Sequence, residues 1–238
     1  MGFFDSLQRM RIYQDRPHAG TRMNRRHAFL ITDFVKDITG ARVLDLGAHD
    51  GRWAYAFAAA GAAQVVGIEA RADVVAGFAA YPDAELRERV SLRVDDVFDG
   101  LEKAIAAGET YDLVAVFGLF YHITDQVRLL RLIRKLAPKV ILIDGEFSQR
   151  PKPIFVLDTE RTDNPVNAPA QVAGQDMALV AIPSFAAMEL MADALDYDLI
   201  WSDWTRLPVD ERRGVQDYFR PQGQGKRRAT CALRPRTR

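Results

Sequence analysis

The sequence has little of what ties a chain to an oxidising compartment, a membrane or a polyanion. Its single cysteine, Cys231, excludes an intrachain disulfide and a cysteine-cluster metal site, and predicts a cytoplasmic location. No apolar run reaches the roughly 18 residues of a membrane span, and the first five residues lack the basic start of a signal peptide. The 32 basic and 32 acidic residues cancel, so no net charge favours nucleic acid, membrane or an acidic partner. We therefore expect a soluble protein with no membrane partner.

The 238 residues, 48% of them hydrophobic, are enough for one large α/β domain. Short apolar runs typical of buried strands follow residue 42 and alternate with helix-like segments. The strand-like runs are 64–69, 90–94, 113–117 and 140–143, and the helix-like segments are 53–60, 74–81 and 126–136. This alternation predicts a mostly parallel sheet with helices on both faces.

Two segments fall outside this alternation. A helix-like stretch from about Arg22 to Ile38 predicts that residues 1–40 form a helical lid or flank of the domain at 41–238. Residues 147–181 hold four prolines and are longer than an ordinary connection, so we expect an insertion after the fifth strand that covers the substrate. Ser184 then begins a helix to Leu195, and residues 199–201 and 229–233 resemble closing strands.

The most informative stretch is V-L-D-L-G-A-H-D-G, which begins at Val43 and precedes an alanine-rich helix. Gly47 and Gly51 permit a sharp turn and the close approach of a ligand. Asp45 would repel a phosphate and attract an ammonium group. The Gly-x-Gly-x-x-Gly spacing of dinucleotide-binding loops is absent, which disfavours a nicotinamide-dependent reductase. The loop predicts a nucleoside ligand that carries a cation.

Polar groups follow three further strands, and the carboxyl ends of parallel strands share one edge of a sheet. Glu69 is suited to accept both hydroxyls of a ribose. Asp95 and Asp96 follow the third strand, where a carboxylate can accept from an adenine amino group beside Val97; one of the two is equally suited to capping the next helix. Residues 117–122, F-G-L-F-Y-H, place carbonyls, an aromatic ring and an imidazole where a reacting group would sit.

The motifs V-L-D-L-G-x-x-x-G, V-G-I-E, V-D-D, Y-D-L-V and G-L-F-Y-H resemble those of class I S-adenosylmethionine-dependent methyltransferases, over about residues 42–144. The resemblance implies a Rossmann-like, seven-stranded, mostly parallel sheet and S-adenosylmethionine as the cofactor. The residues it assigns to the cofactor are Asp45, Gly47, His49, Gly51, Glu69, Ala70, Asp95, Asp96, Val97, Phe117 and Gly118. His49 departs from the pattern, because many members have the middle glycine of G-x-G-x-G at this position.

Methyl transfer from a sulfonium depends mainly on positioning and desolvation, so only some acceptors need a base from the protein. His122 is the first candidate, because a neutral imidazole titrates in the working pH range, and Tyr121 and Glu146 are further candidates. We expect no metal, since Phe117 and Gly118 stand where metal-dependent catechol-type members carry a carboxylate at the end of the fourth strand; Asp144 and Glu146, after the fifth, are the residues that could bind one.

We therefore expect an enzyme that methylates an oxygen or nitrogen of a small molecule, in an enclosed pocket rimmed by Tyr13, His122 and Glu146. One alternative is an RNA methyltransferase, because the Tyr-His ending also resembles tRNA wobble-uridine-modifying enzymes. Basic residues near both ends could form its RNA-binding face: Arg22, Arg25, Arg26, Lys226, Arg227, Arg228, Arg234, Arg236 and Arg238. A second alternative is a module that binds the cofactor without turnover. The charged stretch 158–164 is interpreted as a solvated loop.

Overall fold

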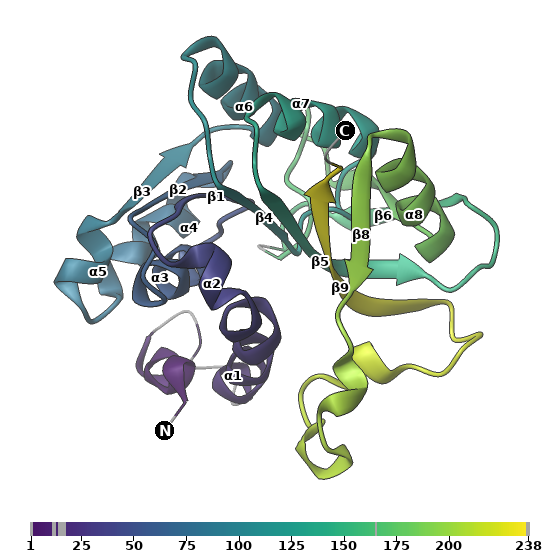
Figure 1. The fold of residues 1–238 in the computed structure, drawn as a ribbon, viewed down its shortest axis with the longest axis horizontal. Coiled ribbons are helices and arrows are strands. Elements are labelled where there is room, and N and C mark those ends of the chain that lie inside the picture. The colour runs from purple at the N-terminus through teal and green to yellow at the C-terminus, as the bar shows by residue number, and fades with distance from the viewer. Residues whose placement is uncertain (1, 11–12, 14–17, 165, 237–238) are drawn as a thin grey trace.

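A seven-stranded sheet with the order β3-β2-β1-β4-β5-β9-β8 forms the centre of residues 2–10, 13, 18–164 and 166–236, which the computed structural model describes (Figure 1). Its strands are β1 (Arg42–Leu46), β2 (Gln64–Glu69), β3 (Val90–Val94), β4 (Leu113–Phe117), β5 (Val140–Ser148), β8 (Tyr197–Trp201) and β9 (Lys226–Pro235). The first five strands pair in parallel, whereas β9 runs antiparallel to both β5 and β8. The predicted Rossmann-like, mostly parallel sheet is confirmed.

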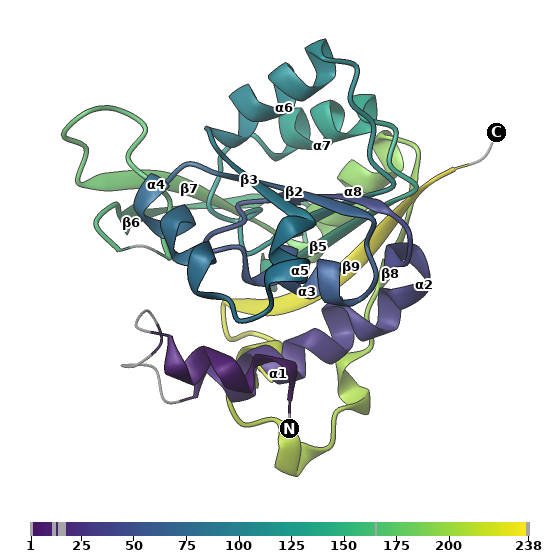
Figure 2. The ribbon, with the colours of Figure 1, turned by 90° about the vertical axis from the view of Figure 1, so that its left-hand side faces the viewer.

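Helices cover both faces of this sheet (Figure 2). The α-helices are α1 (Ala19–Leu30), α2 (Val35–Ile38), α3 (Arg52–Ala59), α4 (Ala72–Val75), α5 (Ala84–Glu88), α6 (Val97–Ala106), α7 (Gln126–Lys135) and α8 (Phe185–Ala194). The short 3-10 helices are η1 (Phe3–Arg9), η3 (Thr32–Phe34), η4 (Ala76–Ala80), η5 (Trp204–Arg206), η6 (Val209–Glu211) and η7 (Gln216–Phe219). Apolar residues of α6, α7 and α8 fill the core on one face, and those of η1, α1 and α3 fill the core on the other.

The register of the parallel strands sets the position of the site. Asp45 of β1 lies opposite Gly67 of β2 and Ala115 of β4, and Phe117 of β4 lies opposite Asp144 of β5. The carboxyl ends of four strands therefore meet at one edge, where the chain turns toward helices. No helix in the described part of the chain combines the length and apolar character needed to cross a bilayer.

Several segments differ in length from the sequence predictions. The single helix expected over 22–38 is divided into α1, η3 and α2, and the break follows Ile31 at the cap of α1. Strand β5 continues to Ser148, five residues past the predicted end, because β9 pairs with its whole extension. Ser184 caps α8 as predicted, since its side chain accepts a hydrogen bond from the Ala187 amide.

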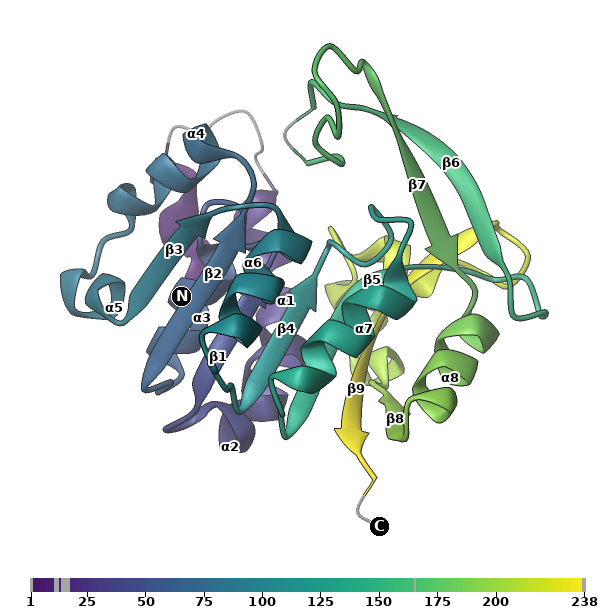
Figure 3. The same ribbon diagram turned by 90° about the horizontal axis from the view of Figure 1, so that it is seen from above.

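The predicted insertion at 147–181 contains β6 (Phe155–Arg161) and most of β7 (Met177–Pro183), which ends two residues beyond it. The two strands form an antiparallel hairpin. The hairpin extends from the end of β5, beyond the same edge of the sheet at which α4 follows β2 (Figure 3). It therefore extends beyond the edge at which the candidate residues gather.

Candidate cofactor and active site

The turn between β1 and α3 adopts the backbone shape that its glycines predict. Gly47 and Gly51 have positive φ angles of 69° and 78°. A Cβ atom added to Gly51 would lie 2.4 Å from the ring of Phe78, so only glycine fits there. The amides of Gly47 and Ala48 both donate to the carbonyl of Ile68, at 2.9 and 3.0 Å. These bonds hold the turn against the end of β2.

Asp45 has a buried carboxylate beside this turn. It is 1% exposed, and its Oδ2 atom has no hydrogen-bond partner among the described residues. Burial, together with the nearby charge of Glu69, raises the pKa of Asp45 to about 8. A buried carboxylate with an open acceptor position fits a cationic ligand group, which would favour its charged form.

Glu69 is fixed at the end of β2 by backbone amides. Its Oε2 accepts from the His49 amide at 3.0 Å, and its Oε1 accepts from the Arg71 amide at 3.1 Å. Each carboxylate oxygen has a second acceptor position, so these bonds orient Glu69 without using all of its capacity. The carboxylate is thereby held at the ligand edge, as the sequence predicts.

Asp95 and Asp96 take different roles at the end of β3. Asp96 caps α6, because its side chain accepts from the amides of Phe98 and Asp99 at 2.8 and 3.4 Å. Asp95 lies 2.5 Å from the ammonium of Lys103. Of the two carboxylates, the structure therefore gives the capping role to Asp96. The predicted neighbour Val97 is buried in the core, and Ala70 is exposed.

His49, which the family pattern does not explain, belongs to a buried polar network. The backbone of His49 has a positive φ of 54°, and the Nδ1 atom of its ring accepts a hydrogen bond from Arg52 at 2.7 Å. Arg52 also donates to Asp50 at 2.7 Å, and Tyr13 donates to the other oxygen of Asp50 at 2.6 Å. Burial opposes ionisation of Asp50, but Arg52, His49 and Tyr13 together outweigh it and hold the pKa of Asp50 well below its usual range. This network connects Tyr13 of the N-terminal segment to the loop.

The turn after β4 brings the predicted Tyr-His pair to the same edge. Gly118 has a positive φ of 82°, and its amide donates to the carbonyl of Asp144 at 2.8 Å. The rings of Tyr121 and His122 lie 4.1 Å apart. Phe117 directs its ring to α3, where it packs on Trp53. Its contact with the cofactor stays a prediction.

His122 is paired with a residue that sequence reasoning assigned to a solvated loop. Its Nδ1 lies 2.6 Å from Oε2 of Glu160 on β6, and the two side chains are 10% and 19% exposed. Burial raises the pKa of Glu160, but the hydrogen bond and charge of His122, the Ala168 amide and the charge of Lys226 together outweigh burial, so the pKa is lowered overall. The two residues are 38 positions apart, and no local pattern in the sequence connects them. Only the hairpin brings them together.

The carboxylates of β5 are occupied by basic residues. Asp144 is fully buried and accepts from Arg26 at 2.6 Å, from Tyr218 at 2.6 Å and from Thr230 at 2.8 Å. Glu146 lies 2.5 Å from Lys226 and 3.4 Å from Arg220. These ion pairs place Glu146 between two basic residues, and its role as a candidate base stays a prediction.

The basic residues predicted as an RNA face are engaged in many separate contacts. Arg22 binds Asp217, Arg234 binds Asp37, and Arg236 binds Asp193 and Asp198. The other contacts are Arg25 with the Arg213 carbonyl, Arg26 and Arg228 with Asp144, Lys226 with Glu146, and Arg227 over the Phe185 ring. Arg238 lies outside the described residues. The contacts with carboxylates offset part of the positive charge that these residues would present to a polyanion.

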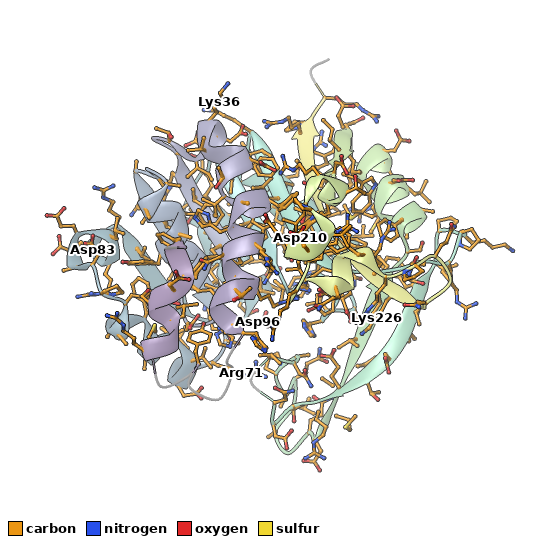
Figure 4. All side chains as sticks on the ribbon, turned by 90° about the horizontal axis from the view of Figure 1, so that it is seen from below. Lys36, Arg71, Asp83, Asp96, Asp210 and Lys226 are labelled. Carbon is orange, nitrogen blue, oxygen red and sulfur yellow. The ribbon has the colours of Figure 1, made fainter. Side chains whose placement is uncertain are left out.

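Two observations describe how the edge is covered. The guanidinium of Arg71, which follows β2, lies 3.5 and 3.4 Å from the carbonyls of Thr162 and Asn164 in the hairpin (Figure 4). The two hollows found in the described part of the chain do not lie at the carboxyl edge of the sheet. One lies against α4 and α5, and the other lies at the amino ends of β1, β4 and β5. An enclosed pocket rimmed by Tyr13, His122 and Glu146 therefore stays a prediction. The described residues contain no cluster of three or more His, Cys, Asp or Glu suited to a metal ion.

Solved structures resemble this fold at low sequence identity. The N-terminal domain of EvdMO1 with SAH bound is 16% identical, with a TM-score of 0.63 over 91% of this chain and 81% of that chain. The DhpI–SAH complex is 14% identical, with a TM-score of 0.56 over 99% and 92% of the two chains. The [4+2]-cyclase SpnF is 16% identical, with a TM-score of 0.57 over 92% and 83%. At these identities the likeness shows the fold alone.

Sequence comparison supplies the family. No curated protein matches the chain. Residues 18–159, more than half of the sequence, match a family described as a methyltransferase domain. The matched region contains the β1 turn, Glu69 and the Tyr-His pair. The chain therefore belongs to the methyltransferase domain family and is an S-adenosylmethionine-dependent methyltransferase.

Proposed function

We propose that this enzyme methylates an oxygen or nitrogen atom of a small molecule, and that His122 removes the proton from the acceptor. The observation that carries the proposal is the His122–Glu160 pair at the end of β4. The cofactor supplies an electrophilic methyl group, and the chain's own residues supply orientation, a dry environment and the base.

The cofactor's binding residues follow from the groups at the edge. The buried carboxylate of Asp45 is suited to the ammonium of the methionine portion, and Glu69 is suited to the ribose hydroxyls. Asp95 and the backbone near Val97 are suited to the adenine. Gly47 and the other residues with positive φ allow close approach to the backbone, which a side chain would prevent.

The geometry of His122 suits a general base. Its Nδ1 faces the carboxylate of Glu160, which fixes the ring and leaves Nε2 to accept a proton. When Nε2 takes that proton, the imidazolium is stabilised by the negative charge of Glu160. The two-residue arrangement needs no metal ion to activate the acceptor. Tyr121 is occupied by Arg228, so we place it in acceptor binding.

A small acceptor is favoured by the chain segments around this edge. The hairpin contacts Arg71 on the opposite side of the cofactor turn, and Tyr13 ties the N-terminal segment to Asp50. We expect both segments to restrict access by a large polymer. The N-terminal domain of EvdMO1 has also been crystallised in the presence of SAH and D-fucose, and this supports a small acceptor by analogy. The cyclase SpnF shares the fold, so chemistry must be tested directly.

The test is an acceptor screen with methyl-labelled S-adenosylmethionine and fractions of small hydroxyl and amine compounds. We expect label in a small-molecule fraction and none in total RNA. Glu69→Ala serves as the binding control, and we expect it to weaken S-adenosylhomocysteine affinity with a smaller effect on saturated turnover. Label transferred to RNA, with a steep salt dependence, would instead support the RNA alternative.

Cofactor affinity is expected to depend on pH through Asp45. Because the pKa of Asp45 is about 8 and the ligand's ammonium pairs with the ionised form, acid weakens binding. We expect the Kd for S-adenosylhomocysteine to improve about tenfold from pH 6 to pH 7 and to level off near pH 8. Isothermal titration at each pH measures this. Asp45→Asn should bind about 10- to 100-fold more weakly at pH 8 and lose the pH dependence.

A further inference from the structure

We infer that the acceptor carries an anionic oxygen group, a carboxylate or a phosphate, and that the guanidinium of Arg228 binds it. The inference rests on the proposed function, because it concerns the acceptor of the same site. It begins from an imbalance of charge: Arg228 and Arg26 share the single carboxylate of Asp144. All three residues are less than 10% exposed. With Arg22 and Asp217, which adjoin this group, three guanidiniums face two carboxylates, so among the described residues the cluster has one positive charge in excess.

The hydrogen bonds of Arg228 are incomplete. Its Nε lies 3.3 Å from Asp144 and 3.9 Å from Asp217, but it is buried without a hydrogen-bond partner among the described residues. Its Nη1 and Nη2 share one oxygen, the Tyr121 hydroxyl, at 3.3 and 3.5 Å. A guanidinium has five donors, and the Nη edge matches the two oxygens of a carboxylate or phosphate.

Other carboxylates near Arg228 are already engaged. Asp217 lies 3.9 Å from Arg228 Nε, but Arg22 holds it with two hydrogen bonds at 2.7 and 2.8 Å. Glu146, the partner of Arg228 in the β5–β9 register, is shared by Lys226 and Arg220. Both carboxylates beside Arg228 are thus shared with other arginines, and the cluster keeps one positive charge in excess among the described residues. Burying an uncompensated charge is costly, so a bound anion would stabilise this arrangement.

The position of Arg228 joins it to the proposed base. A Cβ atom added to Gly118 would lie 3.8 Å from Nη2 of Arg228, so the guanidinium borders the turn after β4. Tyr121 bonds Arg228 through its hydroxyl, and its ring packs on His122. Arg228, Tyr121 and His122 therefore form one row along the edge. An acceptor whose anionic group binds Arg228 would extend its nucleophilic atom along this row toward His122.

The first test is binding, which does not require turnover. Sodium benzoate and inorganic phosphate are titrated separately into the protein saturated with S-adenosylhomocysteine, and the heat and the Tm shift are recorded. We expect at least one of these anions to bind, and Arg228→Gln to weaken it about 10- to 100-fold. Arg228→Lys keeps the charge without the planar fork, and we expect an intermediate loss. Arg234→Gln, an arginine of the same strand that pairs with Asp37, should leave binding unchanged.

The second test compares hydroxybenzoic and aminobenzoic acids with their methyl esters, and aryl phosphates with the parent alcohols, as acceptors of labelled methyl. We expect the charged member of each pair to be preferred, with its KM raised by Arg228→Gln. Failure of both anions to bind, or equal effects of Arg228→Gln and Arg234→Gln, would overturn the inference. Anion binding without methylation of any acceptor, charged or neutral, would count against the proposed function and leave the anion site supported.

Discussion

His122→Ala should lower kcat by about 10²- to 10⁴-fold for an oxygen or nitrogen acceptor, with the Kd for S-adenosylhomocysteine unchanged. The loss follows because Nε2 of His122 is the proton acceptor in the proposed reaction, while the cofactor residues lie at the ends of β1, β2 and β3. Labelled-methyl kinetics at saturating cofactor measure kcat, and isothermal titration measures the Kd.

Glu160→Gln separates two contributions of Glu160, the orientation of the His122 ring and the stabilisation of the imidazolium charge. Glutamine keeps an oxygen acceptor for Nδ1 but removes the negative charge that stabilises the imidazolium, so we expect a smaller loss of kcat than in His122→Ala. His18→Ala is the matched control, because His18 is exposed and lies 3.4 Å from Arg213, outside the pair. If His122→Ala kept the wild-type kcat, His122 would not be the base, and the turn after β4 would contribute only by positioning the acceptor.

Asp144→Ala should destabilise the fold by about 3–5 kcal/mol, because it removes the carboxylate that the buried guanidiniums of Arg26 and Arg228 share. For a chain of this size the corresponding fall in Tm is roughly 6–20 °C. Thermal unfolding followed by circular dichroism measures it. Asp163→Asn removes an exposed ion pair with Arg161, and we expect little change in Tm.

The stabilising effect of Asp144 also has a defined pH dependence. Burial raises its pKa, but Arg26 and Arg228 outweigh burial, so the folded-state pKa lies below its ordinary value. An acid with a depressed pKa stabilises fully above its unfolded pKa of about 3.9, and this stabilisation is lost as pH falls through the folded value. The Tm difference between wild type and Asp144→Ala should therefore be constant near neutrality and shrink below about pH 4. A difference that grows in acid would contradict this assignment.

The part of the fold that sequence could predict is the part encoded by short segments. The bounds of β2, β3 and β4 follow from compact apolar runs, and the glycine turn after β1 follows from two residues four positions apart. Ser184 signals the start of α8 through its own hydrogen bond. Each of these features depends on neighbours within about one turn or strand, which a linear pattern contains.

The features that escaped prediction depend on distant partners. The extension of β5 exists because β9 pairs with it some 80 residues later in the chain. The charged residues around Glu160 are typical of a solvated loop, whereas in the structure the hairpin places Glu160 against His122. Arg228 belongs to a basic stretch whose other members are mostly exposed or half-buried, and only the fold buries its guanidinium beside Asp144. A sequence shows which residues are charged, but it does not show whether a charged side chain is buried or which residue it pairs with.

The strand order also constrains how the enzyme is made. β9 lies between β5 and β8, and Thr230 on β9 binds the same carboxylate as Arg26 on α1. During synthesis α1 emerges from the ribosome some two hundred residues before β9. Arg26 and Asp144 therefore lack their contact with Thr230 until β9 has emerged. During that interval the long edge of β5 is open to unwanted pairing with other chains. The nascent chain is therefore most prone to aggregation immediately before β9 inserts.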